Sequence, residues 1–150
     1  VELCSQDTGT RVLPLNEFIT GVRQTVLKPD ELVSAVLIPP SPISMGSAFE
    51  KLGSRRYLVI SITMTAANVL LGQDGRIEDV RIAVGSCSAV SQRLYELEGD
   101  LKGKTPQDVV VRAEHLAPLS PIDDVRGSGT YRLAAVQEQI QRAVMGASRR

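Results

Sequence analysis

Two alternating segments joined by a short turn sequence constrain the fold of this chain most strongly. Across residues 57–71 the apolar and hydroxyl side chains alternate, with Ile60, Ile62, Met64, Ala66 and Leu70 on one face and Ser61, Thr63 and Thr65 on the other. A period of two is typical of a half-buried strand. Gln73-Asp74-Gly75 suits a tight turn, and 77–85 resumes the alternation with Val80, Ile82 and Val84 inward. The two segments predict an antiparallel hairpin.

The residues after this hairpin switch to helical spacing. Leu94, Leu97 and Leu101 recur at intervals of three and four, and Gly103 follows as a stop. Thr105-Pro106-Gln107-Asp108 is typical of a helix start and predicts a short helix that continues through Ala117.

A last helix is predicted from Thr130 to about Met145. Its inward stripe consists of Leu133, Val136, Ile140 and Val144, and the residues turned away are Arg132, Glu138, Gln141 and Arg142. Strands followed by helices indicate an α+β sandwich in which a small sheet is covered on one face.

The first forty residues differ from this pattern. We predict a strand at 1–4, a turn at 7–9, a loop near Pro14 and an apolar strand at 32–38 that ends at Pro39-Pro40. Residues 41–47 combine Pro42 and Gly46 with small polar side chains, so we place a linker and a domain boundary there. Because the chain begins with a strand residue and not with Met, we expect the start of a longer polypeptide to be missing.

Composition excludes several classes of protein. The 150 residues contain 17 basic and 17 acidic side chains and only 3% aromatic residues, so we expect no nucleic-acid partner. The sequence contains neither an apolar run long enough for a membrane span nor a secretory signal, which predicts a soluble, cytoplasmic protein. Cys4 and Cys87 match no metal or disulfide spacing and are expected to be free buried thiols.

Few residues are candidates for independent chemistry. Gly127-Ser128-Gly129 lacks the third glycine of a dinucleotide fingerprint, and no Gly-Lys-Ser/Thr phosphate loop occurs. For His115, the only histidine, a surface or capping role is favoured over a catalytic one, since no nucleophile motif accompanies it. Arg55-Arg56 either binds a phosphate or lies at a solvated turn.

The polar stretch 122–132, IDDVRGSGTYR, is interpreted as the start of the last helix. Adjacent carboxylates normally point apart, so Asp123 and Asp124 are assigned loop or capping roles and not a catalytic pair. Ser128 or Thr130 can accept hydrogen bonds from the first amides of the helix, and Asp124 is expected to pair with Arg126.

Five segments occur in the order of a known family: RVLPLNEFITGVRQTVLKPDELVSAVLIP, SAFEKLGSRR, GRIEDVRIAVGSCSAV, LEGDLKGK and IDDVRGSGTYR. Together they resemble the flavoprotein, or medium, subunit of the molybdenum hydroxylases, which include xanthine dehydrogenase and carbon monoxide dehydrogenase. The resemblance spans nearly the whole chain.

The resemblance implies an α+β domain with a three-stranded antiparallel sheet packed against three helices. It assigns residues 1–40 to the end of an FAD-binding domain, 41–47 to a linker and 48–150 to the flavoprotein C-terminal domain. The glycine-rich loops that hold the FAD pyrophosphate in the family are expected upstream of this sequence.

The implied function is electron transfer in an oxidoreductase. FAD in this subunit would receive electrons from two-iron two-sulfur clusters on a small subunit, after substrate oxidation at molybdopterin on a large subunit, and pass them to an acceptor. The chain would thus belong to a hetero-oligomer, and the isolated fragment would be inactive. The alternative is a cofactor-free α+β module for dimerisation or subunit docking.

The resemblance also suggests two FAD-binding residues. Val33 falls where the family places an apolar residue near the adenine, and Lys51 where it places a basic residue near the flavin ring; an ordinary strand residue and an exposed lysine are the competing interpretations. The chain departs from the family at Leu58, where an Asp is common, and at Ser91, where a Pro is common. The exchange at Ser91 is expected to replace one helix-start residue with another.

Overall fold

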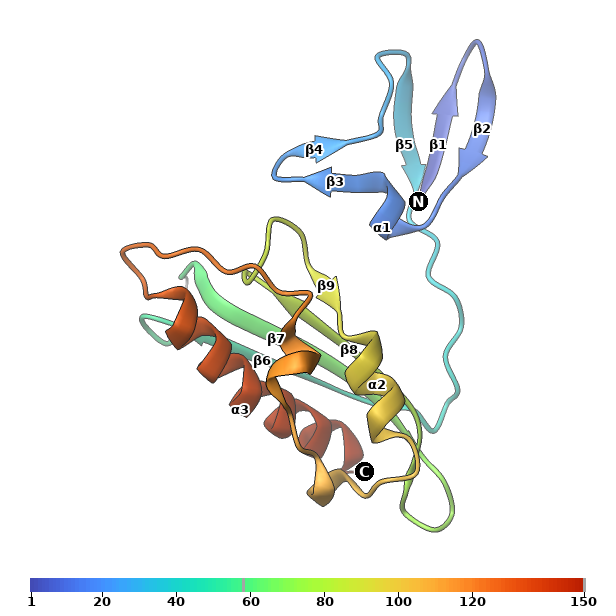
Figure 1. Cartoon of the computed structure of the whole chain (residues 1–150). Helices are drawn as coiled ribbons and strands as arrows, with labels where there is room; N and C mark the ends of the chain where they lie inside the picture. Colours follow the sequence, from blue (N-terminus) through green and yellow to red (C-terminus); the bar gives the residue numbers. More distant parts are fainter. Residues whose placement is uncertain (58, 150) are drawn as a thin grey trace. The chain divides into compact units, whose positions relative to one another are not determined.

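A computed structural model describes residues 1–57 and 59–149, shown in Figure 1. The chain divides into two compact units, Val1–Ser41 and Pro42–Arg150. The division lies at the first residues of the proline-containing segment 41–47. Among the described residues, no helix is both long and apolar enough to cross a bilayer.

The first unit is a small antiparallel sheet with an appended hairpin. Strand β1 (Glu2–Ser5) lies between β2 (Gly9–Val12) and β5 (Glu31–Ala35), and β3 (Ile19–Gly21) pairs separately with β4 (Gln24–Thr25). The predicted first strand and turn are confirmed. The loop predicted near Pro14 contains a single helical turn, α1 (Leu15–Phe18), and β5 ends at Ala35 and not at Ile38.

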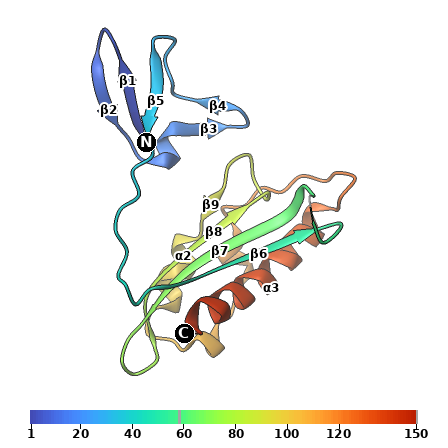
Figure 2. The same ribbon diagram turned by 180° about the vertical axis from the view of Figure 1, so that it is seen from behind.

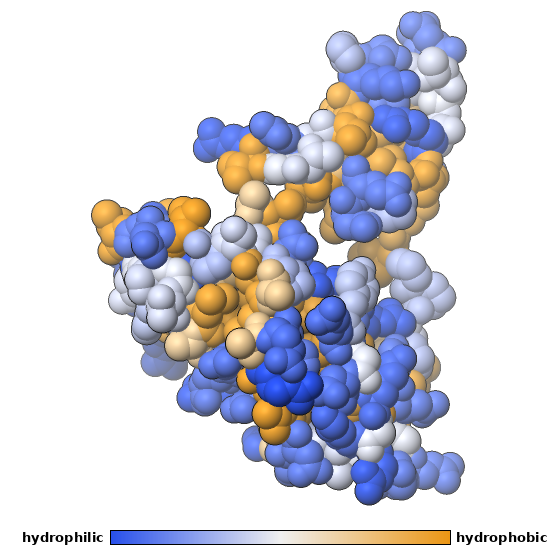
Figure 3. Space-filling view, viewed as in Figure 1, coloured by the Kyte–Doolittle hydropathy of each residue, from blue (hydrophilic) through white to orange (hydrophobic). Residues whose placement is uncertain are grey.

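Little of this unit is buried. Leu3 is its only fully buried large side chain among the described residues, whereas Val12, Leu15, Val36, Leu37 and Ile38 are more than half exposed. Apolar side chains are visible on its surface in Figure 3. A sheet of this size has too small a core to be stable by apolar burial alone.

The second unit is a four-stranded antiparallel sheet in the order β6-β7-β8-β9. The strands are β6 (Gly46–Gly53), β7 (Ser61–Leu71), β8 (Ile77–Gly85) and the short β9 (Gln92–Arg93). Gly75 has φ +75° in the turn between β7 and β8, a conformation that glycine adopts at low cost. The predicted hairpin is confirmed.

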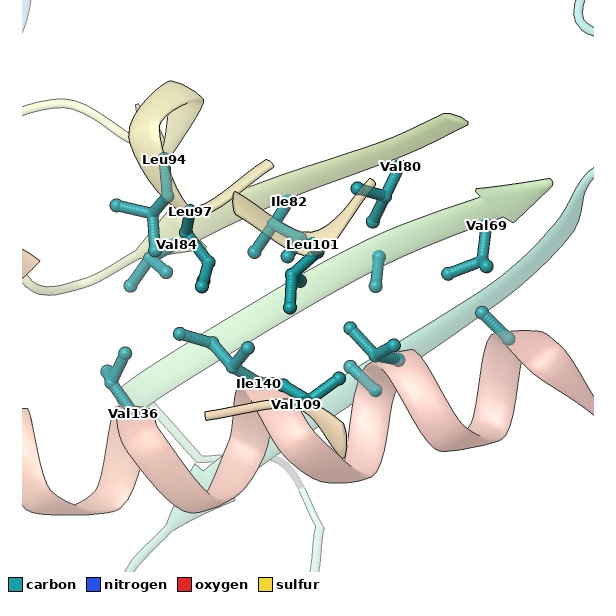
Figure 4. Close-up of a cluster of buried hydrophobic side chains, with 14 of the residues drawn as sticks. Val69, Val80, Ile82, Val84, Leu94, Leu97, Leu101, Val109, Val136 and Ile140 are labelled. Atoms are coloured by element: carbon teal, nitrogen blue, oxygen red, sulfur yellow. The ribbon is translucent and has the colours of Figure 1, made fainter. Parts of the chain in front are cut away.

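All helices of this unit lie on one face of the sheet, as Figures 1 and 2 show from opposite sides. They are α2 (Tyr95–Leu101) and the long α3 (Gly129–Ser148). Side chains of both helices meet β7 and β8 in one apolar core, drawn in Figure 4. The predicted α+β class, with an antiparallel sheet covered on one face, is confirmed.

The helix predicted from Thr105 to Ala117 is wrong. Two 3-10 turns, Pro106–Asp108 and Ala113–Leu116, are separated by irregular backbone at 109–112. Three consecutive valines at 109–111 explain the break, because β-branched side chains disfavour a helix and Val109 instead enters the core. Ser91 precedes β9 and does not start α2, whose first residue follows Leu94.

The buried face of β7 is the one that carries the hydroxyls. Thr63, Thr65, Ala67 and Val69 are buried, whereas Ala66 is exposed. Gln139 of α3 explains this choice, since its Oε1 accepts hydrogen bonds from Thr63 Oγ1 at 2.9 Å and Thr65 Oγ1 at 3.3 Å. Buried hydroxyls are tolerated where they find such a partner.

Arg132 also departs from its predicted orientation. The buried stripe of α3 includes Val136, Ile140 and Val144 as predicted, but Arg132 is only 3% exposed. Its guanidinium donates hydrogen bonds to the carbonyl oxygens of Ile62 in β7 and of Ser86 after β8, and to the carboxylate of Asp124 before α3.

Candidate functional site

Strand β6 presents an exposed aromatic ring and an ammonium group, two residues apart, on the open face of the sheet. Gly46 and Ala48 of β6 contact the last turns of α3, so the alternate residues Phe49 and Lys51 face away from that helix. Phe49 is 60% exposed, and Lys51 is exposed as well. Phe49 pairs across the sheet with Ala66, and Lys51 with Met64.

Lys51 is held in place at its charged end. Its Nζ donates a 2.8 Å hydrogen bond to the carbonyl oxygen of Val59, in the connection between β6 and β7. An ammonium tied to one carbonyl keeps two further donors for another acceptor. The pair Phe49 and Lys51 therefore offers a planar apolar contact and a positive charge to a ligand on this face.

The same connection carries the two adjacent arginines. The Arg56 guanidinium carbon lies 5.4 Å from the centroid of the Tyr57 ring, and Tyr57 is 70% exposed. This stacking occupies one face of Arg56 with a neighbouring ring. Leu58, where the family commonly has an acidic residue, lies outside the described residues.

Val33 lies in β5 of the first unit, opposite Leu3 of β1, and is 44% exposed. Its side chain is accessible to a ligand. Since Val33 and Lys51 belong to different units, the structure describes the surroundings of each one separately.

The described residues fit one part of an FAD molecule. Phe49 and Lys51 match the chemistry of a planar ring that gains negative charge on reduction. The pyrophosphate has no matching cradle in the first unit, where the one helix, α1, has four residues. Glycine-rich phosphate-binding loops are absent from the sequence itself.

The stretch 122–132 forms a compact hydrogen-bonded loop. Asp124 and Gly127 exchange backbone hydrogen bonds, and the Asp124 carboxylate accepts from the Arg126 amide at 2.8 Å and from its Nη1 at 2.9 Å. The predicted pair between Asp124 and Arg126 is confirmed. The hydrogen bond from the Arg126 amide is the main cause that holds the pKa of Asp124 below its ordinary value.

Arg132 joins this loop to two other segments. Its Nη2 donates to Asp124 Oδ1 at 2.6 Å, and its Nη1 donates to the carbonyl oxygens of Ile62 and, at 3.2 Å, of Ser86. Ser86 adopts φ +63°, an uncommon conformation for a residue with a side chain. One guanidinium thus connects the loop before α3, the start of β7 and the end of β8.

The helix start works as predicted through Ser128. Its Oγ accepts from the Tyr131 amide at 3.1 Å, and Asp123 Oδ1 accepts from the Gly129 amide. Asp123 and Asp124 thus have separate structural partners and do not form an acid-base pair. Thr130, the other predicted cap, lies within the helix.

His115 has a capping role, as one of the two interpretations predicted, but it is buried and not on the surface. Its Nδ1 accepts from the Arg112 amide at 3.1 Å, and its Nε2 lies 3.7 Å from Asp100 Oδ2. Both cysteines are free, Cys87 fully buried and Cys4 partly so. Within residues 1–57 and 59–149, no three His, Cys, Asp or Glu side chains gather in a way that could hold a metal ion.

The fold and this surface define a class of protein: a two-layer α+β domain whose helices cover one sheet face and leave the other open. Residues 47–147 match the family described as the CO dehydrogenase flavoprotein C-terminal domain. That match covers more than half of the chain, and the chain belongs to this family.

Individual relatives agree with the family. The nicotine 6-hydroxylase medium subunit of Paenarthrobacter nicotinovorans is 34% identical over 145 residues, which cover 95% of this chain and 50% of that protein. The xanthine dehydrogenase FAD-binding subunit of Escherichia coli O157:H7 is 28% identical over 145 residues, covering 91% and 48% respectively. The chain spans about half the length of these curated relatives.

A solved structure shares the fold. A chain of the reconstituted CO dehydrogenase from Oligotropha carboxidovorans superimposes with a TM-score of 0.85 at 24% identity, covering 98% of this chain and 51% of that one. The likeness extends over both units of the chain.

Proposed function

We propose that this chain forms part of the FAD-binding, electron-transferring subunit of a molybdopterin-dependent hydroxylase or dehydrogenase. The observation that carries the proposal is the pairing of exposed Phe49 with Lys51 on the open sheet face, in a domain of a flavoprotein family. The relatives named as medium and FAD-binding subunits support it.

In this proposal the residues of the chain bind and orient the flavin. Bound FAD supplies the redox chemistry by accepting electrons and passing them on. The Lys51 ammonium, oriented by the Val59 carbonyl, stabilises negative charge that the flavin ring gains, and Phe49 packs against the ring and excludes water. Val33 contacts the adenine end.

The proposal assigns the remaining parts to a larger assembly. Residues 1–40 complete an FAD-binding domain, 41–47 link it to the domain at 48–150, and the pyrophosphate is held by a further part of the same subunit. Iron-sulfur clusters on a small subunit supply electrons obtained at molybdopterin on a large subunit. The hetero-oligomer is cytoplasmic, and this chain alone is inactive.

The test uses the complete FAD-loaded subunit and its visible flavin spectrum. We expect Phe49→Ala and Lys51→Met each to change the flavin absorption bands, because both alter the surroundings of the ring. The controls are Tyr95→Ala and Lys102→Met, which remove an exposed aromatic residue and an exposed lysine elsewhere in the same unit. Spectra that respond equally to the site and control variants would contradict the proposed ring contact.

A cofactor-free docking module is the competing function. It predicts that the complete polypeptide purifies without flavin and that Phe49→Ala weakens the binding of a protein partner only. Flavin content and partner binding therefore separate the two functions.

A further inference from the structure

We propose that Arg132 is a positioning residue for Lys51: through the start of β7 it fixes the carbonyl that orients the Lys51 ammonium. This inference rests on the proposed function, in which Lys51 faces the flavin. Arg132 itself lies on the helical face of the sheet, whereas Lys51 lies on the open face.

Arg132 anchors the start of β7. The side chain is buried, and its Nη1 donates to the carbonyl oxygen of Ile62, the second residue of the strand. Asp124 fixes the other arm of the guanidinium at 2.6 Å, and Asp124 is itself fixed by Arg126. A planar guanidinium held at both arms has little freedom to turn.

Only a short stretch of backbone separates Ile62 from the carbonyl that accepts the Lys51 hydrogen bond. Ile62 lies three residues after Val59, whose carbonyl oxygen accepts the Lys51 hydrogen bond. Strand pairing is irregular here, since the register between β6 and β7 shifts between Leu52 and Gly53. The ladder resumes at the pair of Gly53 and Ser61, and the Arg132 hydrogen bond then fixes Ile62, the next residue of β7.

Arg132 contacts the residue that follows β8 as well. Nη1 of Arg132 also donates to the Ser86 carbonyl, and Ser86 is in the left-handed region with φ +63°. Ser86 is thus held in a conformation that a residue with a side chain seldom adopts. Arg132 Nε is buried without a hydrogen-bond partner in the described part of the chain, so the side chain is oriented by its two terminal nitrogens.

A substitution of Arg132 therefore changes the midpoint potential of the flavin, because it displaces the Lys51 ammonium. A positive charge beside the ring favours the reduced, negatively charged flavin, so its loss or displacement lowers the midpoint potential. A purely structural Arg132 would alter stability and leave the potential unchanged.

The experiment measures the flavin midpoint potential in the complete FAD-loaded subunit. The variants are Lys51→Met, Arg132→Lys and the double variant, with Arg142→Lys as the control, because Arg142 lies on the same helix in an exposed pair with Glu138. We expect Lys51→Met to lower the potential, Arg132→Lys to lower it by less, and the double variant to match Lys51→Met alone. Arg142→Lys should leave it unchanged.

Additive shifts, or no shift with Arg132→Lys while Lys51→Met lowers the potential, would overturn the positioning role and leave the proposed function intact. No shift with Lys51→Met would overturn the proposed function as well. If Arg132→Lys does not fold, Asp124→Asn replaces it with the same expectations, since it weakens the bond that holds the guanidinium.

A second readout needs no flavin. Trypsin cleavage after Arg55 or Arg56 in this chain reports how firmly the connection before β7 is held. We expect Arg132→Lys to accelerate this cleavage relative to Arg142→Lys at a temperature where both are folded. Equal cleavage rates would contradict the anchoring of β7 by Arg132.

Discussion

Asp124 Oδ1 accepts a 2.6 Å hydrogen bond from Nη2 of Arg132, whose side chain is 3% exposed. The pair joins the loop before α3 to the helix itself. Because Arg132 also donates to Ile62 and Ser86, the Asp124 carboxylate neutralises the charge that holds three segments together. A buried arginine without a counter-charge is strongly unfavourable.

Asp124→Asn should therefore lower the thermal unfolding midpoint of the second unit. The amide keeps the size of the side chain but removes the charge that compensates Arg132. Asp123→Asn, which changes only an exposed cap, is the matched control and should have a smaller effect. Equal midpoints for the two variants in calorimetry would argue against a special role for Asp124.

The first unit should lose stability in acid through Glu31. The hydrogen bond from Arg11 is the main cause that lowers the pKa of Glu31 from 4.5 to about 2. A carboxyl group whose pKa is lower in the folded than in the unfolded state stabilises the fold at pH values above its unfolded pKa. This stabilisation is lost as the pH falls, for Glu31 from about 4.5 toward 2. Chemical-shift titration of Glu31 measures this directly.

Glu31→Gln serves as the control for that titration. The variant should be less stable than the parent at neutral pH and should lose less stability between pH 4.5 and 2. A Glu31 carboxyl that titrates near its ordinary value would contradict the pairing with Arg11.

Gly46→Ala should destabilise the contact between β6 and α3. A Cβ at this position would clash with the carbonyl oxygen of Ala147, and the three nearest atoms all belong to the Ala147 backbone, which cannot turn aside as a flexible side chain can. Overpacking of this kind costs about 1–3 kcal/mol in the free energy of unfolding. Gly99→Ala in α2 is the control: nothing lies within 4 Å of its added Cβ, and a helical alanine should stabilise by about 1 kcal/mol.

The hydroxyls of Thr63 and Thr65 should couple to Gln139. Gln139→Leu leaves both buried hydroxyls without their acceptor and is expected to cost about 1–3 kcal/mol. Adding Thr63→Val and Thr65→Val to that variant should recover part of the loss, since apolar groups then face one another. Denaturant unfolding measures all three steps, and a triple variant no more stable than Gln139→Leu would contradict the coupling.

Local sequence signals explain which parts of the fold could be predicted. The hairpin depends on Asp74-Gly75 and on alternation in adjacent strands, and the α2 stop depends on Gly103, so each was recognisable within a short window. The buried face of β7 was not, because Gln139 lies 76 residues after Thr63. A count of apolar side chains in the sequence favours burial of the opposite face of β7, because it does not include the hydrogen bonds from Thr63 and Thr65 to Gln139.

The candidate site also combines residues that the sequence indicates with contacts that depend on the tertiary fold. Lys51 was proposed from a family resemblance, but its partner Val59 and the anchoring of Ile62 by Arg132 depend on tertiary contacts. Arg132 is separated by 70 residues from Ile62, and its place on the helix resembled an exposed position. Phe49 was missed as a site residue; its position two residues before Lys51 on the same strand was the available signal.

Quantitative flavin analysis tests the central claim most directly. The complete subunit and this 150-residue chain would each be purified in the presence of FAD and freed of unbound flavin, and the bound FAD per polypeptide would be measured by absorbance. We predict stoichiometric FAD in the complete subunit and little or none in this chain, because the proposed function assigns pyrophosphate binding to a further part of the subunit. A complete subunit without FAD, or stoichiometric FAD on this chain alone, would contradict the account.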